Sequence, residues 1–239
     1  MDHNDISADC PAGHLKPVSA VRPQMRQKGE KTPMTPQKNT ALEMHARAAA
    51  TLYGIISFDN FFRILKDYYP EDPINKEYIM RYFWTSENND PTYYIRDELI
   101  IHASISSGEI EETWAEIKRN ATKDRLIQYR ILPQKEFLKY ANPAFYEDGD
   151  GVRMMKSYLS DDLEISEEDV EEIMVEMAFI VRSDAVPTYI MTALERRGFA
   201  YGKKCELALM TNGCEMEPDI RRWTTLGYNG HEVAKLRLS

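Results

Sequence analysis

The chain reads LYGIISFDNFFRILKDYYPEDPINKEYIMRYFWTSENNDPTYYIRDELIIH from Leu52 to His102, and this stretch decides the fold. After Ser57, which can cap a helix, apolar residues recur at i, i+3, i+4 and i+7, the spacing of one buried helical face. Pro70 closes that pattern, and a second helical pattern begins after Asn75. The order predicts two consecutive helices followed by paired strands.

A helix-turn-helix with a hairpin behind it is the outline of a winged helix, with Arg96–Asp97 as the expected hairpin tip. In DNA-binding versions the second helix enters the major groove while basic side chains hold the phosphates. Here Lys76 and Arg81 on the second helix and Arg96 in the hairpin would be the nucleic-acid contacts.

The charge of this stretch favours a different use. Residues 52–102 hold five basic and nine acidic side chains, a net of −4, and nucleic-acid affinity rests largely on phosphate neutralisation. A plain scaffold or a protein-docking unit is the alternative. Because helical spacing and strand alternation leave some aromatic residues of the stretch outside the core, Trp84 and Tyr94 are the expected contacts of a docking surface.

Composition divides the rest of the chain of 239 residues. Residues 1–40 hold five of the 12 prolines and show no apolar periodicity, so we expect a disordered leader. A helix is expected from a cap at Thr40 to a stop at Gly54, and residues 125–132 alternate as a strand does. A loop near Glu147–Gly151 is the expected boundary between a winged-helix-like domain, 41–147, and an α-helical domain, 148–239.

The expected C-terminal domain contains a strongly acidic segment, with nine carboxylates between Asp161 and Glu176. An apolar stripe lies behind them, so the pattern predicts an amphipathic helix over Ser166–Val181 with a negative outer face. Such a face is either solvated or an acidic docking surface that imitates a phosphate backbone. The residues expected to bind a partner there are Glu167, Glu168, Glu171 and Glu172. The other helices are expected at about 152–159, 187–198, 203–212, 218–225 and from His231 onward, with glycines, Gly213 among them, between elements.

Catalytic, metal and membrane signals are weak. The sequence contains no Gly-rich phosphate loop, GxSxG or HExxH motif. Its three cysteines, Cys10, Cys205 and Cys214, lack the spacing of a zinc site, so no metal and no cofactor are expected. We find no secretory signal pattern and no apolar run long enough to span a bilayer, so we expect a cytoplasmic protein without membrane contact.

Two segments carry a family resemblance, AAATLYGIISFDNFFRIL (Ala48–Leu65) and RRWTTLGYNGHEV (Arg221–Val233). They resemble a group of helical bacterial proteins that often carry a C-terminal SEC-C zinc motif. The residues that correspond in the second segment are Arg222-Trp223, Asn229-Gly230 and Glu232. The Cys-rich motif itself is absent here, so the resemblance implies a helical architecture and a bacterial or phage origin, but neither a zinc site nor an activity.

The sequence therefore predicts a mostly α fold, with a winged-helix-like N-terminal unit that includes a small β hairpin and an α-helical C-terminal unit. The whole chain has a net charge of −9, and residues 41–239 alone carry −11. We expect a non-enzymatic protein-binding module with a protein partner, in its most specific form an acidic inhibitor or adaptor that binds a basic nucleic-acid-handling protein. A winged-helix nucleic-acid-binding regulator is the alternative. An enzyme of unfamiliar type is a third hypothesis.

Overall fold

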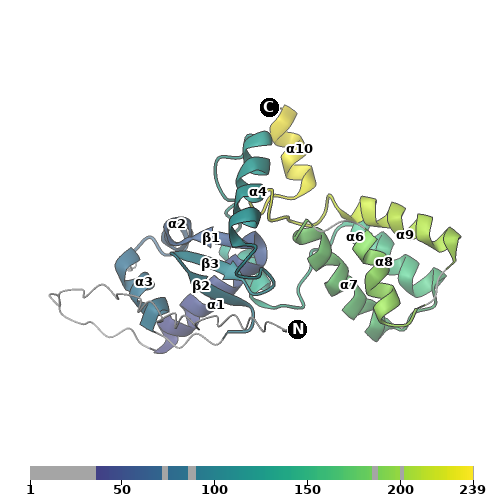
Figure 1. Cartoon of the computed structure of the whole chain (residues 1–239), viewed down its shortest axis with the longest axis horizontal. Helices are drawn as coiled ribbons and strands as arrows, with labels where there is room; N and C mark the ends of the chain where they lie inside the picture. The colour runs from purple at the N-terminus through teal and green to yellow at the C-terminus, as the bar shows by residue number, and fades with distance from the viewer. Residues whose placement is uncertain (1–35, 72–74, 86–89, 185–187, 200–201, 239) are drawn as a thin grey trace, which may run out of the picture. The chain divides into compact units, whose positions relative to one another are not determined.

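In the computed structural model, the described residues are 36–71, 75–85, 90–184, 188–199 and 202–238. They form a mostly α-helical protein with one small antiparallel sheet (Figure 1). This confirms the prediction of a mostly α fold with a small β hairpin. The predicted leader lies almost wholly outside the described residues.

The N-terminal elements follow the predicted order, two helices and then a hairpin. They are α1 (Pro36–Tyr53), β1 (Ile55–Ser57), α2 (Phe58–Tyr68), α3 (Lys76–Thr85), β2 (Tyr93–Arg96) and β3 (Leu99–His102). The strands lie in the order β1-β3-β2, so β1 pairs with β3 across a gap of more than forty residues, and Ile55 lies opposite Ile101. α1 and β1–β3 enclose a core that includes Ile55, Ile100 and Ile101, all fully buried.

Local signals set most boundaries of this unit. Gly54 ends α1 at a φ of +69°, where a residue with a Cβ would be strained. The Ser57 hydroxyl accepts from the Asn60 amide, and the Asn75 side chain accepts from the Tyr78 amide at 2.7 Å, so both predicted caps are confirmed. The prediction for the start of α1 was wrong. That helix already begins at Pro36, and Thr40 lies within it.

The hairpin tip lies one residue later than predicted. Arg96 pairs with Leu99, so the two-residue loop is Asp97–Glu98, with φ angles of +47° and +63°. Two positive φ angles define a type I′ turn, the geometry that matches the twist of the flanking strands. The pairing register of the hairpin therefore holds Asp97 and Glu98 at positive φ angles, which L-residues do not favour.

The middle of the chain contains α4 (Ile110–Lys123), the short helix α5 (Gln134–Phe137) and a 3-10 turn at Leu138–Ala141. The prediction of a strand over 125–132 was wrong. No ladder forms there, and tyrosine hydroxyls satisfy part of the backbone instead. Tyr53 donates to the Arg130 carbonyl and Tyr68 to the Leu132 carbonyl, each at 2.8 Å.

The C-terminal part is helical. Its elements are α6 (Asp150–Ser157), a π-helical turn (Tyr158–Asp162), α7 (Glu167–Arg182), α8 (Thr188–Arg196), α9 (Lys203–Met216) and α10 (Gly230–Leu238). α6 packs against α9, and α7 and α9 both pack against α8 (Figure 1). Their core includes Met155, Ile173, Leu194 and Met216.

Two predictions for this part were wrong. Gly213 lies inside α9 and is closely packed there, with the Ile190 Cδ1 atom 3.0 Å from the position that a Cβ would take. Residues 218–225 form turns instead of a helix. The carboxylate of Asp219 in these turns accepts from the Gly151 and Val152 amides at the start of α6 and so caps that helix.

The predicted boundary near residue 147 stays a prediction. The 221–233 segment nevertheless returns to the first half of the chain, since the Arg130 amide donates to the Leu226 carbonyl at 2.9 Å. Arg130 also forms an ion pair with Glu232 at 3.1 Å. Residues far apart in the sequence are thus tied together within the unit that spans Thr35–Ser239.

Candidate docking surfaces

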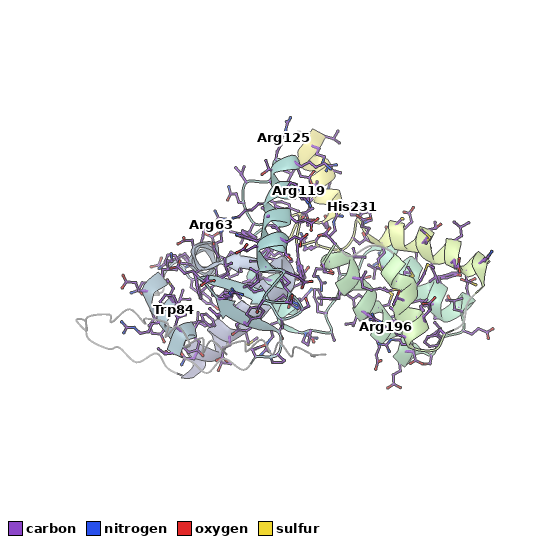
Figure 2. The ribbon with its side chains drawn as sticks, viewed as in Figure 1. Arg63, Trp84, Arg119, Arg125, Arg196 and His231 are labelled. Atoms are coloured by element: carbon purple, nitrogen blue, oxygen red, sulfur yellow. The ribbon has the colours of Figure 1, made fainter. Side chains whose placement is uncertain are left out.

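α3 presents its outer side chains on the side away from the core. Ile79 and Phe83 are buried, whereas Glu77, Arg81 and Trp84, at i, i+4 and i+7, are exposed and share one face. Trp84 is 51% exposed (Figure 2). We call these three residues the α3 face. It offers one large aromatic side chain next to a base and an acid, a combination suited to a protein contact.

Lys76 is engaged by carboxylates. Its ammonium lies 2.6 Å from a carboxylate oxygen of Asp59 in α2 and 3.9 Å from one of Glu98 at the hairpin tip. The hydrogen bond to Asp59 raises the pKa of Lys76. A phosphate would have to compete with both acids, so this geometry disfavours the contact that a groove-reading helix needs.

The other two predicted nucleic-acid contacts, Arg81 and Arg96, differ in their surroundings. Arg81 is exposed on the α3 face. Arg96 donates to the Ser107 carbonyl at 3.1 Å and lies 3.3 Å from the Asp97 carboxylate. Of the three basic residues, Arg81 alone has no carboxylate partner among the described residues.

Tyr94 is only half-exposed. Strand alternation holds, since Tyr93 is buried while Tyr94 lies on the opposite side of β2. The Tyr94 hydroxyl donates to the Ile105 carbonyl at 2.7 Å, and burial raises the pKa of this phenol. Its polar end therefore fixes the hairpin to the following loop, and docking through Tyr94 stays a prediction.

The acidic face of α7 divides into two pairs. Ser166 caps the helix by accepting from the Asp169 amide. Glu171 is bonded to Lys156, which holds the pKa of its carboxyl below the usual range, and Glu172 accepts from Arg197 at 2.5 Å. Glu167 and Glu168 at the first turn are exposed and have no basic partner within the described chain. A cationic partner would meet these two first.

A buried ion pair that the sequence did not reveal lies behind α7. Arg182 at the end of α7 donates to the Glu147 carboxylate at 2.8 Å, and both side chains are largely removed from solvent. Glu147 also accepts from the Tyr140 hydroxyl at 2.7 Å and from the Arg221 amide at 3.1 Å. The predicted loop at residue 147 therefore holds a structural hub. No local motif marks it, because its members are scattered along the chain.

Trp223 forms a second buried centre, in which the segments 48–65 and 221–233 meet. Its ring lies so close to Gly54 that a Cβ there would fall 2.4 Å from the ring, and its indole donates to the Thr51 carbonyl at 3.0 Å. The rings of His102 and Phe179 lie 5.3 and 5.9 Å from it. Burial, helped by the charge of Arg182, lowers the pKa of His102 to about 4.

A metal centre finds no support in the described ranges, which contain no group of three or more His, Cys, Asp or Glu side chains placed to hold an ion. Cys205 and Cys214 are free thiols. The other sequence candidate, Cys10 with His14, lies outside the described residues. No helix among the described residues is long and apolar enough to cross a membrane.

Comparison with known proteins gives no relative. No family model, no curated protein and no solved structure matches the chain.

Proposed function

We propose that this chain is a non-enzymatic, cytosolic protein-binding module whose α1–β3 unit is a winged helix used for docking. One observation carries the proposal. On α3, Lys76, which a nucleic-acid reader would use, forms ion pairs with Asp59 and Glu98, while Trp84 on the same helix is 51% exposed. The helix that would read a groove thus offers an aromatic anchor, and of its two basic side chains only Arg81 lacks a carboxylate partner among the described residues.

The element order and sheet order support the winged-helix part of the proposal. α1, β1, α2 and α3 precede the β2–β3 hairpin, and β3 lies between β1 and β2. The α3 face lies on the second helix of the helix-turn-helix pair, the position that enters the groove in DNA-binding versions. The proposal keeps this position as the docking site and changes its ligand from nucleic acid to protein.

The partner in the most specific form of the proposal is a basic nucleic-acid-handling protein, which the chain inhibits or recruits. The support is the charge of −11 over residues 41–239 and the exposed pair Glu167 and Glu168 at the N-terminus of α7. Charge complementarity of this kind raises association rates and selects partners more than it adds affinity. Trp84 would supply affinity and the glutamates the choice of partner.

A first experiment separates protein docking from nucleic-acid binding. Purified chain is titrated into labelled mixed-sequence DNA and RNA at low and at moderate salt and followed by gel shift. The expected result is no shift at either salt concentration. Salt-sensitive binding that is lost in Lys76→Ala/Arg81→Ala would overturn the proposal in favour of the regulator alternative.

A second experiment tests the docking face. Partners are captured from the native host with the wild-type chain, and the affinity of the recovered protein is then measured for variants. Trp84→Ala is expected to weaken binding by about 30-fold or more, as a central aromatic anchor does. Ile127→Ala is the matched control, because Ile127 is 89% exposed and lies outside α3. Equal affinity of both variants contradicts docking through Trp84.

A further inference from the structure

α9 leaves an apolar stripe uncovered. Leu207 is 70% exposed, Met210 is 43% exposed, and Cys214 is exposed as well. These positions follow the i, i+3, i+7 spacing of a single helical face. The opposite face is already used, since Leu209 and Met216 are buried in the core shared with α6 and α8. The stripe is therefore a second apolar face on a helix whose packing within the described chain is complete.

The stripe ends in opposite charges. Lys203, one turn before Leu207, is exposed, and Glu217, which caps the helix directly after Met216, lies on the same side. Glu217 accepts from Arg222 at 2.6 Å and keeps part of its carboxylate accessible. From Lys203 to Glu217 the steps along the stripe are four, three, four and three residues, the spacing of a helix–helix seam.

We propose that α9 is the interface of a homodimer, in which it packs antiparallel against α9 of a second copy around a two-fold axis at Met210. Around that axis Lys203 lies against the partner subunit's Glu217, and the same pair recurs at the other end. Met210 meets its own counterpart at the centre. One set of side chains supplies both halves of the contact, as a closed two-fold interface requires.

Charge selects the direction of this pairing. A parallel pair would place Lys203 beside the partner subunit's Lys203 and Glu217 beside the partner subunit's Glu217, and like charges in contact repel. The antiparallel pair matches each with its opposite. Because the stripe is short, it buries less than the roughly 800 Å² per partner of a standard interface, so the dimer dissociates on dilution. The α3 face lies on a different helix, so this proposal is independent of docking through Trp84.

The mass of the full chain in solution tests the dimer. At a chain concentration on the order of 100 µM, multi-angle light scattering is expected to give about twice the monomer mass of 27.8 kDa, and this mass should fall on dilution. Met210→Lys places two like charges at the axis and should raise the dissociation constant at least about tenfold. Thr211→Lys is the matched control, because Thr211 is exposed but lies about 100° around the helix from Met210, at the flank of the stripe and not at the two-fold axis.

A wild-type chain that stays at 27.8 kDa over this concentration range overturns the proposal. The proposal also fails if Thr211→Lys and Met210→Lys weaken association equally, because the contact then lies elsewhere. Both positions are exposed, so neither variant is expected to unfold the chain.

Disulfide trapping tests the direction and the axis. In a chain with Cys10, Cys205 and Cys214 changed to Ser, Met210→Cys is expected to form a dimeric disulfide with copper–phenanthroline as oxidant. A chain whose only cysteine is Cys214 should form no dimeric disulfide. In the antiparallel pair the two copies of Cys214 lie about 12 Å apart along the helix axis, beyond disulfide reach. Trapping through Cys214 in preference to position 210 contradicts the antiparallel arrangement.

Discussion

Trp84 on α3 and Trp223 in the 221–233 segment belong to regions that use their side chains in opposite ways. Trp223 is 4% exposed, donates its indole hydrogen to Thr51 and packs on Gly54, whereas Trp84 is 51% exposed. The region around Trp223 joins residues more than one hundred positions apart. The α3 face lies on the outer side of a helix that is anchored by the buried side chains of Ile79 and Phe83. Tryptophan therefore stabilises the fold at position 223 and is available for contact with a partner at position 84.

This contrast separates substitutions that affect folding from those that affect function. Around Trp223, the backbone amide of that residue donates to the Arg182 carbonyl, and Thr224 donates to Asp184. Any change there disturbs several segments at once. On the α3 face a change alters only what the surface offers. A loss of partner binding at Trp84 can thus be assigned to the contact itself, while one at Trp223 cannot.

The largest expected effect is that of Trp223→Ala. The substitution removes a buried ring and its hydrogen bond and leaves a cavity against Gly54, so the free energy of unfolding should fall by about 3–5 kcal/mol. Trp84→Ala, the matched substitution on the α3 face, should change it by less than about 0.5 kcal/mol. Urea denaturation followed by circular dichroism measures both. Similar losses for the two variants would remove the distinction between the two regions.

A pH-dependent effect of intermediate size is expected at His102, whose ring packs against those of Phe179 and Trp223. Its folded-state pKa of about 4 is below the ordinary value of 6.5, so the unfolded chain takes up the proton first. The stability that depends on a neutral His102 is therefore present above pH 6.5 and is lost as the pH falls toward 4. The loss amounts to at most about 3 kcal/mol.

The variant His102→Gln cannot titrate, which isolates this contribution from that of the carboxylates. The difference in unfolding free energy between wild type and His102→Gln should change across the interval from pH 6.5 to 4, in the direction that penalises the wild type at acid pH. Parallel stability curves for the two proteins would show that protonation of His102 is not coupled to unfolding.

Local signals predicted the parts of the fold that local chemistry controls. Ser57, Asn75 and Gly54 set helix ends through caps and a positive φ, and these ends were predicted correctly from the sequence. The strand predicted over 125–132 failed because the alternation of its residue types is not followed by burial: Leu126, Tyr129 and Leu132 are buried, three residues apart, in an irregular segment. Tyr53 and Tyr68 satisfy part of its backbone. Over so short a segment, a period-two pattern of residue types predicted neither which side chains are buried nor which groups bond to the main chain.

The sequence predicted which residue types lie on the candidate surfaces, but it did not predict which side chains they form ion pairs with. The acidic helix and the exposed tryptophan follow from residue type and spacing. The partners of Lys76, Glu171 and Glu172 come from other helices and from the hairpin tip, so no local pattern could assign them. Glu147 with Arg182, and Trp223 with Gly54, depend in the same way on contacts between distant segments.

The smallest expected effect lies at the hairpin tip and has the opposite sign to those around Trp223. Glu98 has a φ of +63° in the type I′ turn, a conformation that costs an L-residue about 1 kcal/mol and that glycine adopts freely. Glu98→Gly should therefore raise the free energy of unfolding by up to about 1 kcal/mol, measured by urea denaturation. Glu98→Gln keeps the strained backbone and removes the charge, so it should leave stability unchanged, and Lys76 retains its closer partner Asp59. If both variants gain equally, the gain comes from the charge and not from the turn. If only the glycine variant gains stability, the gain comes from relief of backbone strain in the turn close to Lys76. The region around Trp223 offers no such gain, because Gly227 there already is a glycine with a positive φ and packs on Tyr53, so any substitution of it should destabilise the fold.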